Sequence, residues 1–209
     1  MKKFYVAVLV IVFSFILSIY LYPRLPEMIA SHWDLNGNVN GYMNKFWGVF
    51  MLPIVLTGIL ILFSLIPKID PLRKNIEKFR KYFDRFILMI VFFMSYVYIL
   101  TIAWNLGYRF NMNLMMAPAI GALMFFIGGV LEKAERNWFI GIRNPWTLSS
   151  DKVWKKTHKI GGKLFKLFGV AMLIGLLFNN MMFWIVLIGA VGLSLFLFVY
   201  SYVIWKNEK

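Results

Sequence analysis

Five long runs without a charged residue constrain this chain more than any other feature. They cover residues 4–22, 46–66, 86–104, 114–131 and 167–205. The first four runs hold 18 to 21 residues each, and a helix of that length crosses a hydrocarbon core of about 30 Å. The chain is therefore expected to be a multi-span membrane protein.

The last run has 39 residues and is about twice too long for one crossing. Asn179 and Asn180 lie near its middle, and Asn tolerates turn conformations. We therefore expect two spans joined by a tight hairpin at this pair. The prediction is an all-α membrane protein in which residues 1–209 form one domain of six transmembrane helices.

The distribution of Lys and Arg predicts the orientation of these helices. Of the 23 basic residues, 20 lie at the two termini or in the connections 67–85 and 132–166, whereas Arg24, Lys45 and Arg109 lie on the other side. Cytoplasmic connections carry the excess of Lys and Arg in membrane proteins. Both termini are therefore expected to face the cytoplasm.

Composition also excludes several classes of function. The chain has no Cys, so disulfides and thiol chemistry are excluded, and its two His residues are far apart in sequence. The net charge of +14 is explained by the inner connections, so direct binding to nucleic acid is not expected. The apolar runs contain no ionisable Asp, Glu, Lys, Arg or His, which disfavours an ion-coupled carrier. No metal or other cofactor is predicted.

The connection 23–45 is predicted to be a compact loop outside the cytoplasm. Its turn signals are the pairs Asn36-Gly37 and Asn40-Gly41. Trp33 and Tyr42 are expected at the depth of the lipid headgroups. A calcium-binding loop is rejected, because its twelfth position would be Trp47 where a bidentate Glu is required.

The connection 67–85 alternates basic residues with apolar ones. The apolar positions recur at spacings of three and four and are Leu72, Ile76, Phe79, Tyr82 and Phe83. That periodicity predicts an amphipathic helix. Its basic character favours a position on the anionic inner leaflet.

The connection 132–166 contains the most specific stretch, residues 141–162. We expect an extended or turned start at Arg143-Asn144-Pro145, because Pro145 disfavours helix at the residue before it. A helix from about residue 150 to 160 would be capped by a hydroxyl of Thr147, Ser149 or Ser150. It would place Trp154 and His158 on one face and end at Gly161-Gly162.

These residues resemble a known family signature. The matching inner positions are Gly141, Ile142, Arg143, Pro145, Trp146, Thr147, Leu148, Ser149, Ser150, Val153, Trp154, Thr157, His158, Gly161 and Gly162. In this order they resemble the SdpI/YfhL family of bacterial immunity membrane proteins. The outer positions Pro26, His32, Trp33, Asn36, Gly37 and Lys45 resemble the domain DUF1648 that accompanies the signature.

The resemblance implies a polytopic cell-membrane protein, not an enzyme, that gives resistance to a sporulation-delaying peptide toxin. It also implies signal transduction in which a cytoplasmic winged-helix autorepressor is held at the membrane. Membrane lipids, the peptide toxin outside and this repressor inside are the expected partners. The six outer positions would sense the toxin, and the inner positions expected to bind the cytoplasmic partner are Arg143, Pro145, Trp146, Thr147, Ser149, Ser150, Trp154, Thr157, His158, Gly161 and Gly162.

Two other classes of function stay open from the sequence. A transporter or lipid-handling protein would fit spans without charges, and a lateral hydrophobic groove between spans would support it. An intramembrane enzyme would have to use His32 with Asp34, or His158 with Ser149 and Asp151. Neither set offers a nucleophile oriented by a base and a third group.

Overall fold

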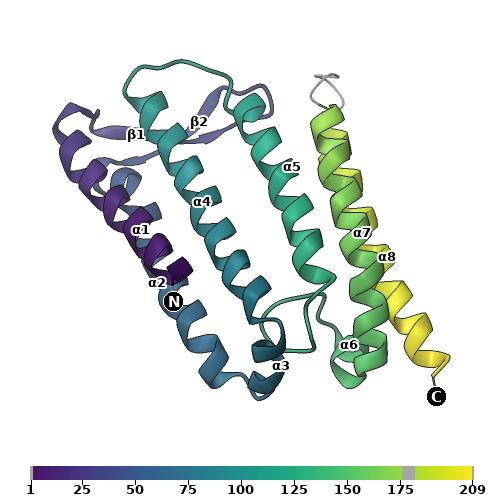
Figure 1. Ribbon diagram of the computed structural model, residues 1–209. Helices are drawn as coiled ribbons and strands as arrows, with labels where there is room; N and C mark the ends of the chain where they lie inside the picture. The colour runs from purple at the N-terminus through teal and green to yellow at the C-terminus, as the bar shows by residue number, and fades with distance from the viewer. Residues whose placement is uncertain (1, 176–181, 209) are drawn as a thin grey trace. The chain divides into compact units, whose positions relative to one another are not determined.

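The computed structural model describes residues 2–175 and 182–208. The elements are α1 (Lys2–Leu21), η1 (Tyr22–Arg24), β1 (Met28–Trp33), β2 (Val39–Asn44), α2 (Lys45–Ile69), α3 (Arg73–Lys78), α4 (Arg80–Asn105), α5 (Met112–Leu131), α6 (Pro145–Ser149), α7 (Asp151–Gly175) and α8 (Met182–Lys206) (Figure 1). They form two compact units. The first consists of Met1–Phe63 with Ile87–Ala119, and the second of Ser64–Phe86 with Ile120–Lys209.

Five helices in the described part of the chain are long and apolar enough to cross a membrane. They cover Lys3–Arg24, Lys45–Ile69, Arg80–Asn105, Met112–Leu131 and Trp184–Lys206. A multi-span helical protein is thus confirmed. The predicted turn at Asn179 and Asn180 lies outside the described residues.

The helix α7 is the one expected span that does not reach this length of apolar sequence. Its first half carries the basic residues of the connection 132–166, and its uncharged part runs only from Leu167 to Gly175 in the described range. In the second unit, α7 packs along α8 (Figure 1). The described part of α7 is therefore amphipathic over its first half and uncharged only toward its end.

The expected all-α fold is wrong in one region, because the connection 23–45 contains a β-hairpin. β1 pairs antiparallel with β2, with Met28 opposite Asn44 and Trp33 opposite Val39. Asn36-Gly37 forms the predicted turn, and Gly37 has a φ of 81° that favours glycine. The second predicted turn is wrong, since Gly41 lies within β2 opposite His32.

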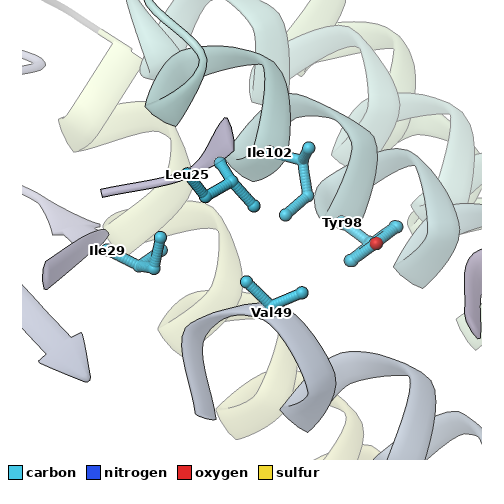
Figure 2. Close-up of a cluster of buried hydrophobic side chains, with 5 residues drawn as sticks. All are labelled: Leu25, Ile29, Val49, Tyr98 and Ile102. Atoms are coloured by element: carbon cyan, nitrogen blue, oxygen red, sulfur yellow. The ribbon is translucent and has the colours of Figure 1, made fainter. Parts of the chain in front are cut away.

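A cluster of buried side chains joins the hairpin to the helices of the first unit. Figure 2 shows Leu25, Ile29, Val49, Tyr98 and Ile102, which come from the segment after η1, β1, α2 and α4. Each is less than one-twentieth exposed, so η1 and β1 are held against two of the helices. The hairpin is thus part of the core of this unit.

In the second unit, the segment 67–85 does not form the expected single amphipathic helix. α3 ends before Phe79, and α4 begins at Arg80. The apolar side chains of Ile76, Phe79 and Phe83 are 0%, 2% and 0% exposed. Because protein atoms cover these side chains, they cannot provide the lipid-facing side of a surface helix.

Glycines bring α5 and α7 into backbone contact within the second unit. A Cβ atom added to Gly162 would lie 2.6 Å from the carbonyl oxygen of Gly128, and one added to Gly121 would lie 2.9 Å from that of Gly169. The expected helix end at Gly161-Gly162 is therefore wrong. Gly162 serves close packing of two helices, and α7 continues through it to Gly175.

Candidate functional site

The signature at residues 141–162, here called the inner motif, is built around two stacked rings on α7. The ring centroids of Trp154 and His158 lie 3.8 Å apart, with an interplanar angle of 16°. Their residues are 0% and 1% exposed. The prediction that both side chains share one helix face is confirmed, and that face points into the protein.

Hydrogen bonds satisfy every polar atom of this ring pair. Trp154 Nε1 donates to the carbonyl oxygen of Ala134 at 2.7 Å. The backbone N–H of Ile142 donates to His158 Nε2 at 2.9 Å, and His158 Nδ1 lies 2.9 Å from the carbonyl oxygen of Trp154. Because Nε2 accepts, the proton of the neutral ring is on Nδ1 and donates to that carbonyl.

Burial makes His158 a neutral residue at physiological pH. Removal from solvent lowers its pKa from 6.5 to about 4, although the hydrogen bond to the carbonyl of Trp154 acts in the opposite direction. A second ring proton would also point at the Ile142 N–H, another donor. The site therefore holds His158 as a structural acceptor.

Gly141 allows the preceding loop to approach the stacked rings. Its φ of 131° lies in a region that disfavours side chains. A Cβ atom here would lie 2.9 Å from Cη2 of Trp154 and would also collide with Nε2 of His158. Glycine at the start of the signature thus lets the loop come close enough for the Ile142 N–H to bond His158.

Asn144 and Thr147 form a reciprocal cap at the start of α6. Asn144 Oδ1 accepts from the Thr147 N–H at 2.9 Å, and Thr147 Oγ1 accepts from the Asn144 N–H at 3.0 Å. Asn144 Nδ2 also donates to Ser201 Oγ on α8 at 2.7 Å. Neither α6 nor the role of Asn144 was predicted, although an Asn followed by Pro and, three residues on, by Thr is a helix-start signal.

Ser149 and Ser150, the other two predicted caps, have different roles in the structure. Ser150 is the residue before α7, and its Oγ accepts from the Val153 N–H at 3.3 Å, as expected of an N-cap. Ser149 is exposed, and its Oγ donates to the carbonyl oxygen of Trp146 at 3.0 Å. Trp146 packs on α8, with its ring centroid 4.6 Å from that of Phe198.

The predicted inner residues divide by exposure. Arg143, Pro145 and Ser149 are exposed, and Trp146 and Ser150 are half-buried. The buried ones are Thr147, Trp154, Thr157, His158, Gly161 and Gly162. Buried side chains shape the motif from inside, and only the exposed ones are accessible from outside the protein.

Two charged residues outside the predicted site hold the loop before the motif. Arg136 Nη1 donates to the carbonyl oxygen of Leu148 at 2.7 Å, and its Nε lies 2.6 Å from Asp151 Oδ1. Asp70 is 2% exposed and accepts the Trp138 N–H at 3.0 Å. Their partners are distant in sequence, so no local pattern could identify them.

At the other candidate site, Asn105 attaches the hairpin to α4. Its Oδ1 accepts from the Ala30 N–H at 2.8 Å, and its Nδ2 donates to the Ala30 carbonyl oxygen at 3.0 Å. The amide thereby pairs with β1 as a neighbouring strand would. It satisfies both backbone groups of a residue that is 0% exposed.

A second amide holds the hairpin turn. Asn113 Nδ2 donates to the carbonyl oxygens of Asp34 and Leu35, at 2.9 Å in each case. Asp34 Oδ1 accepts the N–H groups of Asn36 and Asn38 at 2.9 and 2.8 Å, which stabilises the turn from within. The turn is therefore ordered by amide and carboxylate side chains rather than by apolar packing.

The predicted outer residues do not gather in one pocket. Asn36 and Gly37 lie in the turn, whereas Lys45 lies at the opposite end of the hairpin, 3.2 Å from Glu27 Oε1. Pro26 is exposed before β1. His32 is exposed and bonds Asn40 Oδ1 through Nδ1, and Trp33 packs edge-on against Trp104 at 5.7 Å.

Neither candidate acid–base pair is assembled. His32 bonds Asn40, while the Asp34 carboxylate accepts backbone N–H groups. His158 uses both ring nitrogens within the motif, and Asp151 pairs with Arg136. Among the described residues there is also no group of three His, Asp or Glu side chains placed to hold a metal ion.

Comparisons with known proteins identify two regions of this chain. Residues 9–57 match the Domain of unknown function (DUF1648), and residues 133–201 match the SdpI/YfhL protein family. The Immunity protein SdpI of Bacillus subtilis (strain 168) is 28% identical over 164 residues, which cover 78% of this chain and 76% of that protein. No solved structure matches the chain significantly. The chain therefore carries a DUF1648 region followed by an SdpI/YfhL region, which confirms the family resemblance seen in its sequence.

Proposed function

We propose that this chain is a membrane immunity protein that gives resistance to a membrane-active peptide toxin of the sporulation-delaying type. The observation that carries the proposal is the similarity to the Immunity protein SdpI, which extends over most of both chains. The five helices of membrane-spanning length support the location. The protein would act by binding and not by catalysis.

The proposed topology has six spans with both termini in the cytoplasm. The excess of basic residues in the connections 67–85 and 132–166 supports this orientation. α7 packs along α8, and its uncharged end from Leu167 to Gly175 would enter the membrane as the fifth of the six spans. In this topology the hairpin faces outward and the inner motif faces the cytoplasm.

The hairpin is the proposed contact for the toxin. Met28, Leu35 and Tyr42 on this hairpin are 54%, 67% and 57% exposed. Exposed apolar side chains beside the outer leaflet suit a peptide that partitions into the interface. Asn105 and Asn113 would keep this surface in a fixed position on the first unit.

The inner motif is the proposed contact for a cytoplasmic winged-helix repressor. Arg143, Pro145 and Ser149 would touch the partner, since they are exposed. Trp154 and His158 would act indirectly by holding the loop in shape. The predicted role of the motif is thereby divided between contact residues and internal supports.

Survival of a toxin-sensitive bacterium tests the immunity proposal. Cells that express this chain are challenged with purified sporulation-delaying peptide and compared with cells that carry an empty vector. Protection is the expected outcome. Equal killing at confirmed membrane abundance would contradict the proposed toxin.

A matched pair of variants tests the inner contact. Arg143→Ala removes an exposed motif residue, and Lys159→Ala removes an exposed basic residue of α7 from outside the predicted set. We expect Arg143→Ala to abolish protection and the retention of the repressor at the membrane, at unchanged membrane abundance. If both variants behave like the wild type in survival and in an operon reporter, the contact is not at Arg143.

A lateral groove supports a second candidate function, the handling of a lipid or an amphipathic peptide. This groove has a volume of about 250 Å³ and lies in the first unit between α1 and α4. Val10, Phe13 and Leu17 line it from α1, and Phe92 and Ile99 line it from α4. Chain-dependent export of a labelled peptide from vesicles would favour this function, and retention of the label would favour passive binding.

A further inference from the structure

One exposed tryptophan in the second unit is held rigidly by its backbone. Trp138 is 49% exposed. Its N–H donates to Asp70 Oδ2 at 3.0 Å, and its carbonyl oxygen accepts from Arg143 Nη1. The chain therefore holds the backbone of Trp138 on both sides of its Cα and leaves about half of the residue exposed.

The side chain of Asn137, the residue before Trp138, bonds the backbone of the same loop. Its side chain is 0% exposed and uses Oδ1 to accept the N–H groups of Phe139 and Ile140 at 2.9 and 2.7 Å. Its Nδ2 donates to the carbonyl oxygens of Glu135 and Ile140, at 2.9 Å in each case. A loop with so many internal bonds loses little conformational entropy when its exposed ring is bound.

Asp70 also ties this loop to the end of a membrane-spanning helix. Its second carboxylate oxygen accepts the Leu72 N–H at 2.6 Å, so its charge is directed into the protein. The residue before it, Ile69, ends α2 and is 55% exposed. Ile69 and Trp138 are thus two exposed apolar residues, one next to Asp70 in sequence and the other hydrogen-bonded to it.

The sequence around Asp70 is basic. Lys68, Arg73 and Lys74 lie within four residues of Asp70 and are exposed. Asp70 is the only acidic residue between Lys68 and Lys74, and its carboxylate is buried. This part of the chain therefore presents positive charge next to exposed apolar side chains.

We infer that Ile69, Trp138, Lys68, Arg73 and Lys74, here called the Trp138 patch, form a docking surface for anionic phospholipids. Continuity with α2 places the patch where a spanning helix leaves the hydrocarbon, the depth at which Trp is enriched. The exposed cations complement phospholipid headgroups of negative charge. The patch would anchor the start of the inner motif to the membrane.

The inference rests on the proposed membrane location but needs neither the toxin nor the repressor. The full chain, labelled with 5-fluorotryptophan, is placed in lipid nanodiscs of phosphatidylcholine with increasing fractions of phosphatidylglycerol. Trp138→Phe identifies the fluorine resonance of Trp138, and Trp138→Tyr serves if the first variant folds poorly. Buried Trp154 supplies the internal control resonance.

The expected result has two parts. Lipids that carry a spin label near the headgroup should broaden the Trp138 resonance, whereas a water-soluble gadolinium chelate should leave it sharp. Phosphatidylglycerol should shift this resonance, and Lys74→Gln should raise the lipid fraction needed about fivefold, which corresponds to ~1 kcal/mol per basic residue.

Two outcomes would overturn the inference. Broadening of Trp138 by the aqueous chelate but not by the labelled lipid would show that the ring faces water. An equal response to phosphatidylcholine and phosphatidylglycerol would exclude a preference for anionic lipid. Neither outcome bears on immunity, which is measured by survival.

Discussion

The outer hairpin and the inner motif are attached to their helices through different kinds of side chain. In the hairpin, the half-buried amides of Asn105 and Asn113 bond strand and turn backbone. In the inner motif, Trp154 and His158 fill the interior, and their ring nitrogens bond the loops around them. Both regions have buried contacts, but the hairpin backbone is bonded by half-buried amides, whereas the loops of the inner motif are bonded by the buried rings themselves.

This difference separates the two histidines of the chain. His32 is exposed and bonds one neighbouring side chain on the hairpin, whereas His158 is 1% exposed and bonds backbone on two segments. Water replaces a lost bond at an exposed site, but a buried site keeps the unpaired groups and the empty volume. Removal of a buried residue such as His158 should therefore cost more stability than removal of an exposed one such as His32.

The largest expected effect is that of Trp154→Ala on the inner motif. It removes a fully buried ring, leaves the Ala134 carbonyl unpaired, and should cost about 3–5 kcal/mol of unfolding free energy. Trp47→Ala is the control, since Trp47 is 51% exposed. Thermal unfolding in detergent measures both, and equal melting temperatures would show that the motif does not depend on its interior ring.

Acid should weaken the inner motif by a somewhat smaller amount. The unfolded chain takes up a proton at His158 below about pH 6.5, whereas burial lowers the pKa of the folded residue to about 4. The stability that the neutral ring of His158 contributes is therefore complete above pH 6.5 and is lost as the pH falls toward 4. The total loss is about 3 kcal/mol of unfolding free energy, at ~1.4 kcal/mol per pH unit. Unfolding of the wild type and His158→Gln across this range measures it, and parallel pH curves would contradict the neutral buried ring.

In the hairpin, Asn105→Ala should have an intermediate effect. It leaves the N–H and carbonyl of Ala30, which is 0% exposed, without partners, and should cost about 1–3 kcal/mol. Asn113→Ala is the matched control, because it frees the carbonyls of Asp34 and Leu35, which are half-buried and exposed, and not those of a fully buried residue. Hydrogen exchange at Ala30 should rise only in the first variant; a rise in both or in neither would remove the distinction.

The smallest effect on stability is expected for His32→Ala. An exposed side chain of this kind contributes within about 0.5 kcal/mol. Protection against the toxin should nevertheless fall, if the hairpin is the toxin contact proposed above. Measurement of melting temperature and survival together separates these roles, and full protection by this variant would exclude His32 from the toxin contact.

Hydropathy predicted the spanning helices because long apolar runs need no partner to be recognised. The hairpin was missed because β2, with the sequence VNGYMN, has no regular alternation of apolar and polar residues. The strands also depend on Asn105, which lies 75 residues from Ala30 in sequence. Local patterns contain no information about such a contact.

The inner motif was recognised as specific, but its residue types were interpreted too simply. Trp and Arg are common at partner interfaces, so Trp154 was expected to contact a partner, whereas the structure buries it completely. Gly162 was expected to end a helix, but it admits the backbone of Gly128. Whether a glycine breaks or packs a helix depends on neighbours that only the fold supplies.

The glycine contacts between α5 and α7 give the second unit a mechanical property. Carbonyl oxygens of Gly128 and Gly121 lie where side chains would otherwise separate the two helices. A backbone surface cannot repack by changing rotamers, so sliding of one helix along the other meets steric overlap at both contacts. α7 would thus move as a rigid body, so that a displacement imposed at its Gly175 end would be transmitted in full to its Asp151 end.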